Sequence, residues 1–318
     1  MNDKNTYLPK FEVDEEMMNL VTEITNKMNT LKINRDNNNL HLRKKNRLMS
    51  LQSTLAIENN SLSLKQVTDI IDGKRVIGKI KEIKEVKNIY NAYENINKYN
   101  PNNMKDLLNA HKYITSDLVK ESGKFRSNDV GIYDSRGNVV HMGARPEYIL
   151  QQMNKLFSWL KTSNTHPIIK SCIFHFELEF IHPFEDGNGR IGRLWQTVIL
   201  TNYNNIFEYM PIETIIYKNQ RKYYEALNIS NKNNNSTEFI KFMLYMILKS
   251  FDNINDNLNI TERDIIVLLE NNKDITYDEL VKETGKSKRT ISRCLKKLKD
   301  DKKIIRIGSD KNGYWKVV

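Results

Sequence analysis

Residues 181–195 read IHPFEDGNGRIGRLW and bring a histidine, two acids, a Gly-Asn-Gly turn and two arginines within fifteen positions. The preceding apolar run, residues 167–181, predicts a largely buried helix that must end at His182, because a residue before proline disfavours helical backbone. A histidine at a helix end, beside a polar loop, can present a ring nitrogen and act as a general base. This stretch is therefore the first candidate for a catalytic site.

The glycines of the loop predict an anion-binding site. Gly187 and Gly189 allow positive φ, so backbone N–H groups can turn inward, and a second helix is expected to begin at Asn188 or Gly189. Turned amides at a helix N-terminus attract anions. Arg190 and Arg193 are three positions apart, so we expect both on one side of the first turn, where two guanidiniums suit more than one phosphate.

One acid adjoins this cradle. Asp186 is suited to Mg²⁺, which proteins usually bind through one or two carboxylates and the phosphates of a nucleotide. With His182 as base, the set predicts attack of an activated hydroxyl on a nucleotide phosphate, accelerated by positioning and charge stabilisation. The chain has no GxxxxGK(S/T) loop and no kinase catalytic loop, so neither of those templates fits.

The elements that must position these residues are mainly helices. Apolar periodicity predicts helices at residues 63–71, 81–93, 103–119, 147–160, 167–181, 188–203, 219–228 and 237–251. Residues 130–142 predict a β-hairpin around a turn at 134–138. We expect three parts: a helical arm (1–45), a catalytic domain (46–252) and, after a polar linker at 252–259, a C-terminal domain (260–318).

The C-terminal domain has the pattern of a winged helix-turn-helix, with helices at 261–271, 276–284 and 287–299 followed by strand, turn and strand. Lys288, Arg289 and Arg293 are candidate DNA contacts on the last helix. Basic winged helices also serve in protein docking or dimerisation, so a DNA partner and a homodimer both remain open.

Composition adds weaker constraints. Lysine and arginine number 50 against 39 acids, and the net charge of +11 fits a polyanionic partner or an ordinary solvated surface. Two distant cysteines without metal-ligand spacing suit a reducing cytosol and favour neither disulfides nor zinc. We find no signal peptide and no membrane-length apolar run, and expect a cytoplasmic protein without a membrane partner. The Asn, Lys and Ile richness is typical of AT-rich bacterial genomes.

The run from His182 to Arg193 resembles the Fic family signature, HxFx(D/E)GNGRxxR, at every specified position, and the similarity covers roughly residues 48–251. The resemblance implies a mainly α fold, a helical core with a β-hairpin flap, and transfer of AMP from ATP to a Ser, Thr or Tyr hydroxyl of a protein. It makes His182 the general base, Phe184 the anchor of the loop and Asp186 the Mg²⁺ ligand. The implied phosphate-binding residues are Gly187, Asn188, Gly189, Arg190 (β-phosphate) and Arg193 (γ-phosphate).

Two further stretches resemble the family. Three residues match the segment that lines its adenosine pocket, although the first two also suit one core face of a helix: Tyr224, Leu227 and Asn231. The hairpin stands where the family has a target-docking flap that pairs main chain with main chain. Its expected docking residues are Val130, Gly131 and Ile132.

Residues 54–59, TLAIEN, resemble the family's inhibitory motif (S/T)xxxE(G/N) through Thr54, Glu58 and Asn59, in a short helix expected around 53–60. We call residues 54–59 the inhibitory segment. The resemblance implies that Glu58 pairs with Arg193 and takes the charge that the γ-phosphate needs, so that ATP binds with its α-phosphate out of line for attack. One ion pair contributes ~1–3 kcal/mol against the ~5.5 kcal/mol of a full switch, so we expect leaky inhibition unless the helix also blocks the site.

Two hypotheses of different class follow. The first is a self-inhibited protein adenylyltransferase that uses ATP and Mg²⁺ to modify protein targets, with itself among the candidates. The second is a DNA-binding regulator whose Fic site senses nucleotide. Removal of AMP from targets by the inhibited state, a de-AMPylase activity, is a further alternative.

Overall fold

The computed structural model describes residues 9–30, 37–133, 139–308 and 313–318, and the turn expected at 134–138 lies outside them. The chain forms two compact units, Lys44–Ser250 with an N-terminal helix and Phe251–Val318 with a short preceding segment. The predicted mainly α fold is confirmed. Among the described helices, none combines the length and the hydropathy needed to cross a bilayer.

Helices account for most of the first unit. In chain order they are α1 (Glu15–Thr30), α2 (Asn37–Ile57), α3 (Leu64–Ile71), α4 (Ile80–Glu94), η1 (Ile96–Lys98), α5 (Met104–Thr115), α6 (Pro146–Thr162), α7 (Pro167–Ile181), α8 (Asn188–Tyr203), η2 (Asn205–Tyr209), α9 (Ile212–Lys218), α10 (Gln220–Asn233) and α11 (Thr237–Asn271). Each predicted helix of this region is found. The sequence analysis missed α9, because seven mostly apolar residues carry no helical periodicity.

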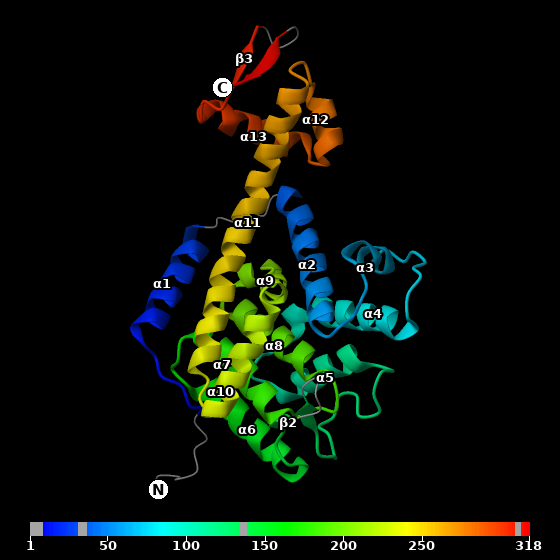
Figure 1. Cartoon of the computed structure of the whole chain (residues 1–318), viewed down its shortest axis with the longest axis vertical. Helices are drawn as coiled ribbons and strands as arrows, with labels where there is room; N and C mark the ends of the chain where they lie inside the picture. The colour runs from blue at the N-terminus through cyan, green and yellow to red at the C-terminus, as the bar shows by residue number, and fades with distance from the viewer. Residues whose placement is uncertain (1–8, 31–36, 134–138, 309–312) are drawn as a thin grey trace. The chain divides into compact units, whose positions relative to one another are not determined.

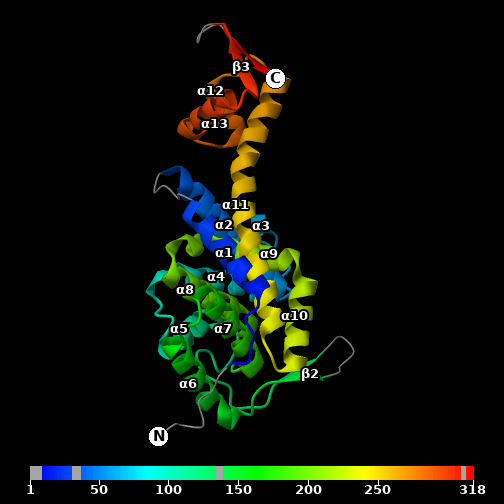
Figure 2. The same ribbon diagram turned by 90° about the vertical axis from the view of Figure 1, so that its left-hand side faces the viewer.

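α7 and α8 lie in the middle of this unit, surrounded by the other helices in both views (Figures 1 and 2). Both helices are buried on nearly every face, which explains why their hydrophobic residues show no single stripe. Trp195 of α8 is fully buried, and its indole N–H donates to the carbonyl of Pro101 at 3.2 Å. The loop that joins these two helices, residues 182–187, lies within the 181–195 stretch, so the site is held by the core itself.

The N-terminal helix α1 packs beside α11 (Figure 1). Its buried apolar residues are Met17, Leu20, Val21 and Ile24. Polar contacts fix its start: Lys241 lies 3.0 Å from Glu16, and the Tyr245 hydroxyl donates to Glu16 at 2.9 Å. Met18, next to Met17 in the chain, is exposed.

The short helix expected around 53–60 is wrong in extent. The inhibitory segment begins in the last turn of α2, a helix of 21 residues that no glycine or proline interrupts. α2 ends at Ile57, and the chain turns at Asn59, whose φ of 64° lies in the left-handed region that asparagine tolerates. Its second half packs into the core, with Leu51, Thr54 and Leu55 buried.

The predicted hairpin is confirmed. β1 (Gly131–Tyr133) pairs antiparallel with β2 (Val139–Met142), with Gly131 opposite Met142 and an irregularity between Ile132 and Tyr133. The base of the hairpin is tied to the core, because the Ala144 amide donates to the carbonyl of Ile181 at 3.0 Å.

The second unit has the predicted winged helix order: the end of α11, α12 (Tyr277–Thr284), α13 (Lys288–Asp300), β3 (Ile304–Ile307) and β4 (Tyr314–Val317). Thr276 and Glu279 form a capping box at the start of α12, and Gly285, with a φ of 65°, ends that helix. The expected linker at 252–259 is wrong as a local structure, because α11 continues through it. Polar residues alone do not end a helix that contains neither glycine nor proline.

Candidate functional site

His182 ends α7 in the left-handed region, with φ 52° and ψ 59°. Pro183 explains the position of this ending, because proline disfavours right-handed helical backbone in the residue before it. Histidine tolerates the left-handed region better than bulky or branched residues. The helix therefore stops where the sequence predicted, and His182 opens the loop that carries the site.

The loop is anchored through Phe184. Its ring is fully buried and stacks on His111 with ring centroids 3.7 Å apart. The Asn188 side chain brackets the same residue, donating to the Phe184 carbonyl at 2.9 Å and accepting from its amide at 3.0 Å. The Asn188 side chain thus holds the loop, which leaves its backbone amide at the start of α8 for an anion.

His111 of α5 holds the next part of the loop, and the sequence analysis missed it. Its Nδ1 accepts from the Gly123 amide at 3.0 Å, so the Nε2–H donates to the Asp186 carbonyl at 2.9 Å. Burial lowers the pKa of His111 to about 4, so the ring is neutral in this role at neutral pH. In the sequence, the one sign of this role is that His111 is a polar residue on the apolar face of a predicted helix.

Two glycines shape the opening of α8. Gly187 caps the helix with a φ of 87°, a conformation that L side chains rarely adopt. Gly189 faces Glu58, and a Cβ built there would lie 2.3 Å from a Glu58 carboxylate oxygen. At Gly187 and Gly189, the start of α8 therefore has no side chain in front of its backbone amides.

Asp186 lies at this opening. Burial alone would raise the pKa of Asp186, but Arg190 and the Gly187 amide, both bonded to its Oδ1, hold that pKa below the usual value. Its side chain keeps 42% exposure. An ionised, half-exposed carboxylate beside an anion cradle fits Mg²⁺. Within the described ranges no three His, Cys, Asp or Glu residues cluster as a metal site, so such an ion would draw its other ligands from phosphate and water.

A cavity of about 270 Å³ opens on this loop. Its lining residues are Glu58, Glu179, His182, Glu185, Asp186, Gly187, Asn188, Gly189, Arg193, Tyr223, Tyr224, Leu227, Asn228 and Asn231. It brings together the loop, Glu58 and all three residues predicted for the adenosine pocket. The Asn231 side-chain oxygen is buried without a hydrogen-bond partner in the described protein, so it can accept from a ligand N–H.

Glu58 and Arg193 form the expected ion pair, with 2.6 Å between Glu58 Oε1 and Arg193 Nη2. Arg193 is 2% exposed and also donates from Nε to the Thr54 hydroxyl at 2.8 Å. Burial alone would lower the pKa of Arg193, but the Glu58 carboxylate raises it above its usual value. Gln220 and Tyr224 both donate to the carbonyl of Ile57, at 3.0 and 3.3 Å, and so hold the end of α2 against α10.

Arg190 has different surroundings from Arg193. Its guanidinium pairs with Asp186 at 2.8 Å and with Glu85 of α4 at 3.8 Å. It is 4% exposed, and of the described residues that line the cavity Arg193 is one and Arg190 is not. The sequence predicted both arginines on the side of α8 that faces the anion. In this structure Arg193 lines the cavity and Arg190 does not.

Glu179 of α7 is a second carboxylate in the cavity, and the sequence analysis missed it. Burial and then the Glu58 charge raise the pKa of Glu179 to about 7. Its carboxylate lies 4.0 Å from His175, whose pKa burial lowers to about 3. Glu179 therefore changes charge near neutral pH beside the ion pair.

Arg126 links the hairpin to the loop and was also missed. Its Nε donates to the His182 carbonyl at 2.7 Å, and its Nη atoms donate to the carbonyls of Asn128 and Ala144 at either end of the hairpin. Burial lowers its pKa from the usual arginine value. One side chain thus ties both hairpin ends to His182, at a position where the sequence shows only an arginine in a loop.

The candidate DNA contacts Lys288, Arg289 and Arg293 are all exposed on α13. Lys288 lies 2.9 Å from Asp278 of α12. The inner face of α13 is apolar, with Ile291 and Leu295 in the core of the winged helix. The basic residues therefore lie on the face of α13 that this core leaves open.

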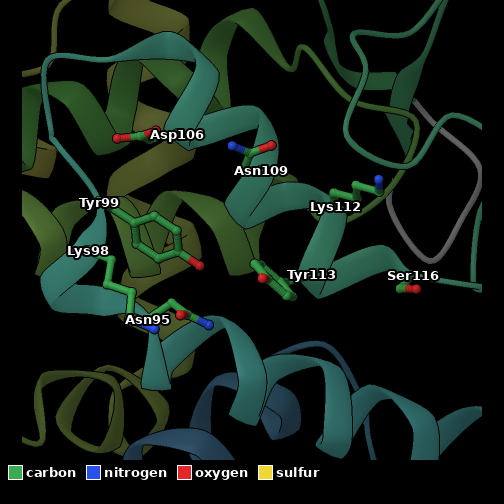
Figure 3. Close-up of a pocket in the computed structure, with 8 residues that line it drawn as sticks. All are labelled: Asn95, Lys98, Tyr99, Asp106, Asn109, Lys112, Tyr113 and Ser116. Carbon is green, nitrogen blue, oxygen red and sulfur yellow. The ribbon is translucent and has the colours of Figure 1, made fainter.

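A second cavity, of about 530 Å³, lies between η1 and α5 (Figure 3). Tyr99 and Tyr113 face it together with Asp106, Lys98 and neighbouring polar residues. It has charges of both signs and no glycine-lined helix start, so it suits a polyphosphate less well than the first cavity.

Comparisons with known proteins identify relatives of both units. Residues 101–200 match the model of the Fic/DOC family, and residues 258–305 match a winged helix-turn-helix DNA-binding family. The chain is similar to the crystal structure of a Fic family protein from Desulfovibrio desulfuricans G20, with 34% identity, 98% of both chains covered and a TM-score of 0.75.

Curated relatives include protein adenylyltransferase fic-1 of Caenorhabditis elegans, 31% identical over 56% of this chain and 35% of the relative. The protein adenylyltransferase Fic of Nematostella vectensis is 28% identical over 62% of this chain and 46% of the relative. This chain thus spans less than half the length of these two relatives.

Proposed function

Because the chain belongs to the Fic family, we propose that it is a self-inhibited protein adenylyltransferase that moves AMP from ATP to a Ser, Thr or Tyr hydroxyl of a target protein. The names of the curated relatives support this activity. The proposal covers ATP and Mg²⁺ as co-substrate and cofactor, and the protein itself as one candidate target.

The proposed reaction uses the loop between α7 and α8. His182 takes the proton of the target hydroxyl, and the hydroxyl oxygen forms a bond to the α-phosphorus while the bond to the bridging oxygen breaks. Pyrophosphate carries the electron pair away. The amides from Gly187 to Gly189 and Arg193 stabilise the charge that develops on the phosphates.

Asp186 would hold Mg²⁺, which would neutralise phosphate charge when bound. Tyr224, Leu227 and Asn231 would bind the adenosine, with the buried Asn231 oxygen accepting from the base. Target segments would pair with the hairpin edge at Val130, Gly131 and Ile132.

Self-inhibition would come from the Glu58–Arg193 pair. The Glu58 carboxylate pairs with the buried guanidinium of Arg193, which the γ-phosphate would need, so ATP can bind in a productive pose only if Glu58 moves. Glu58 lines the cavity and is exposed, whereas most residues of the preceding turns of α2 are buried. Release would therefore involve the side chain and the last residues, and not the whole helix. This ion pair is the observation that carries the proposal.

The test is incorporation of α-labelled ATP into cell lysate and into the protein itself, with Mg²⁺. We expect weak label with the natural chain, strong label with Glu58→Gly, and none with Glu58→Gly/His182→Ala. Absence of label with Glu58→Gly would refute the transferase. Loss of label from pre-modified target would then point to AMP removal.

The winged helix supports a second candidate function, DNA binding by the C-terminal unit. Exposed Arg289 and Arg293 would contact bases or phosphates. DNA selected from a random pool for binding to this protein should bind with an affinity that falls steeply as the salt concentration rises. The double variant Arg289→Ala/Arg293→Ala should weaken this affinity at least tenfold. If the natural chain and this variant bind DNA equally, α13 is not the contact surface. If the natural chain binds no DNA, protein docking or dimerisation takes the place of DNA binding.

A further inference from the structure

The family resemblance assigns Arg190 to the β-phosphate of ATP, but in the structure two acids, Asp186 and Glu85, hold its guanidinium. Its guanidinium is 4% exposed, is not among the groups that line the cavity, and lies 3.8 Å from Glu85 of α4. Glu85 is itself only 13% exposed. Solvent screens such a pair weakly, so the Glu85 charge acts strongly on Arg190.

The same carboxylate also touches the chain that follows the inhibitory segment. Asn60 donates from Nδ2 to Glu85 Oε2 at 2.8 Å and to the Glu82 carbonyl at 3.2 Å. Asn60 is 7% exposed and lies two positions after Glu58. One oxygen of Glu85 therefore faces Arg190, while the other fixes the end of the segment that carries Glu58.

We propose that Glu85 is a second inhibitory acid, a positioning residue that keeps Arg190 away from the phosphates and couples Arg190 to the inhibitory segment through Asn60. The inference rests on the proposed function. In the resting protein each of the two arginines is then neutralised: Arg193 by Glu58, and Arg190 by Glu85 together with Asp186.

Binding of ATP would favour movement of Arg190 away from Glu85. Its Nε is buried without a hydrogen-bond partner among the described residues. A phosphate oxygen could satisfy this N–H and replace the long contact to Glu85 with a charge-assisted hydrogen bond. Such a shift would free Glu85 from Arg190 and change its hold on Asn60, so nucleotide and inhibitory segment would influence each other.

The same helix offers a matched control. Glu82, one turn before Glu85, accepts from the Ser61 amide and hydroxyl at 3.2 and 3.1 Å and lies 3.5 Å from Lys79. It holds the same stretch of chain through contacts that do not involve an arginine. Glu82→Gln and Glu85→Gln remove equivalent charges, and only the second is expected to act on Arg190.

The first experiment measures equilibrium binding of ATP with Mg²⁺ and of AMP to the full-length chain by calorimetry. Glu85→Gln should bind ATP about three- to tenfold more tightly, because one repelling charge near the β- and γ-phosphates is gone, while AMP affinity changes less than twofold. Glu82→Gln should change neither affinity more than twofold. Equal tightening for ATP and AMP, or an unchanged ATP affinity, would overturn the proposal.

The second experiment measures label from α-labelled ATP, with Glu58→Gly as positive control. Glu85→Gln and Asn60→Ala should both exceed the natural chain severalfold. If Glu58→Gly labels strongly and neither variant exceeds the natural chain, the role of Glu85 is refuted while the transferase stands. If Glu58→Gly gives no label, the transferase fails, and the ATP-to-AMP affinity ratio still decides the role of Glu85.

Discussion

Replacement of Glu58 is the sharpest perturbation that the structure offers. Glu58 lies one residue after the last residue of α2, so Glu58→Gly removes the carboxylate without placing a glycine inside a helix. Glu58→Gln is the matched variant, because it keeps the shape and a hydrogen-bonding oxygen but loses the charge. The two variants separate the charge of the side chain from its bulk.

The magnitude follows from the geometry of the ion pair. A hydrogen bond to a charged group contributes ~1.5–3 kcal/mol. Arg193 is almost fully buried, but the Glu58 side chain is 36% exposed, and solvent screening reduces the contribution to about 1–2 kcal/mol. At 1.4 kcal/mol per factor of ten, Glu58→Gly should raise the initial rate of AMP incorporation about 5- to 30-fold. The inhibition of the natural chain is thus expected to be incomplete.

The assay is initial-rate labelling with α-labelled ATP at saturating Mg²⁺, with the nucleotide affinity measured in parallel. Glu58→Gln should reach at least half the rate of Glu58→Gly if the charge is responsible. A Glu58→Gln rate equal to that of the natural chain, together with a fast Glu58→Gly, would show that bulk and not charge blocks the γ-phosphate. Equal rates in all three proteins would refute inhibition by Glu58.

Three further predictions concern stability. The pKa of Glu179 is raised to about 7 in the folded state, so its contribution to the free energy of unfolding is largest at low pH and is lost as the pH rises from about 4.5 through 7. Glu179→Gln should therefore flatten the pH dependence of urea unfolding in that interval. Phe184→Ala removes a fully buried ring stacked on His111 and should lower the free energy of unfolding by about 3–5 kcal/mol, measured by urea denaturation; a loss below 1 kcal/mol would contradict its role as the loop anchor. Gly187→Ala forces a side chain into a φ of 87° and should destabilise by about 1–2 kcal/mol, visible as a lower midpoint, whereas an unchanged midpoint would mean that the loop adopts another backbone path.

Much of the site was predictable because its signals are local. Pro183 explains why α7 stops at His182, the glycines start α8, and Asn59 turns the chain after α2, each through the backbone preferences of one or two residues. The β-hairpin and the order of the winged helix followed in the same way. The predictions were wrong where no local signal marks a boundary. Polar composition suggested a linker at 252–259, which lies inside α11, and the short helix expected around 53–60 is only the end of the longer α2.

By itself, then, the sequence determined the reacting loop, the helical fold and the pairing partners implied by the family motif. Only the tertiary structure decided which groups surround that loop. His111, Arg126 and Glu85 come from parts of the chain far from the loop, and Glu85 and Arg190 are more than a hundred positions apart. No periodicity connects such residues, because packing of helices from distant parts of the chain brings them together. The Glu85 charge on Arg190 is therefore a property of the packed core.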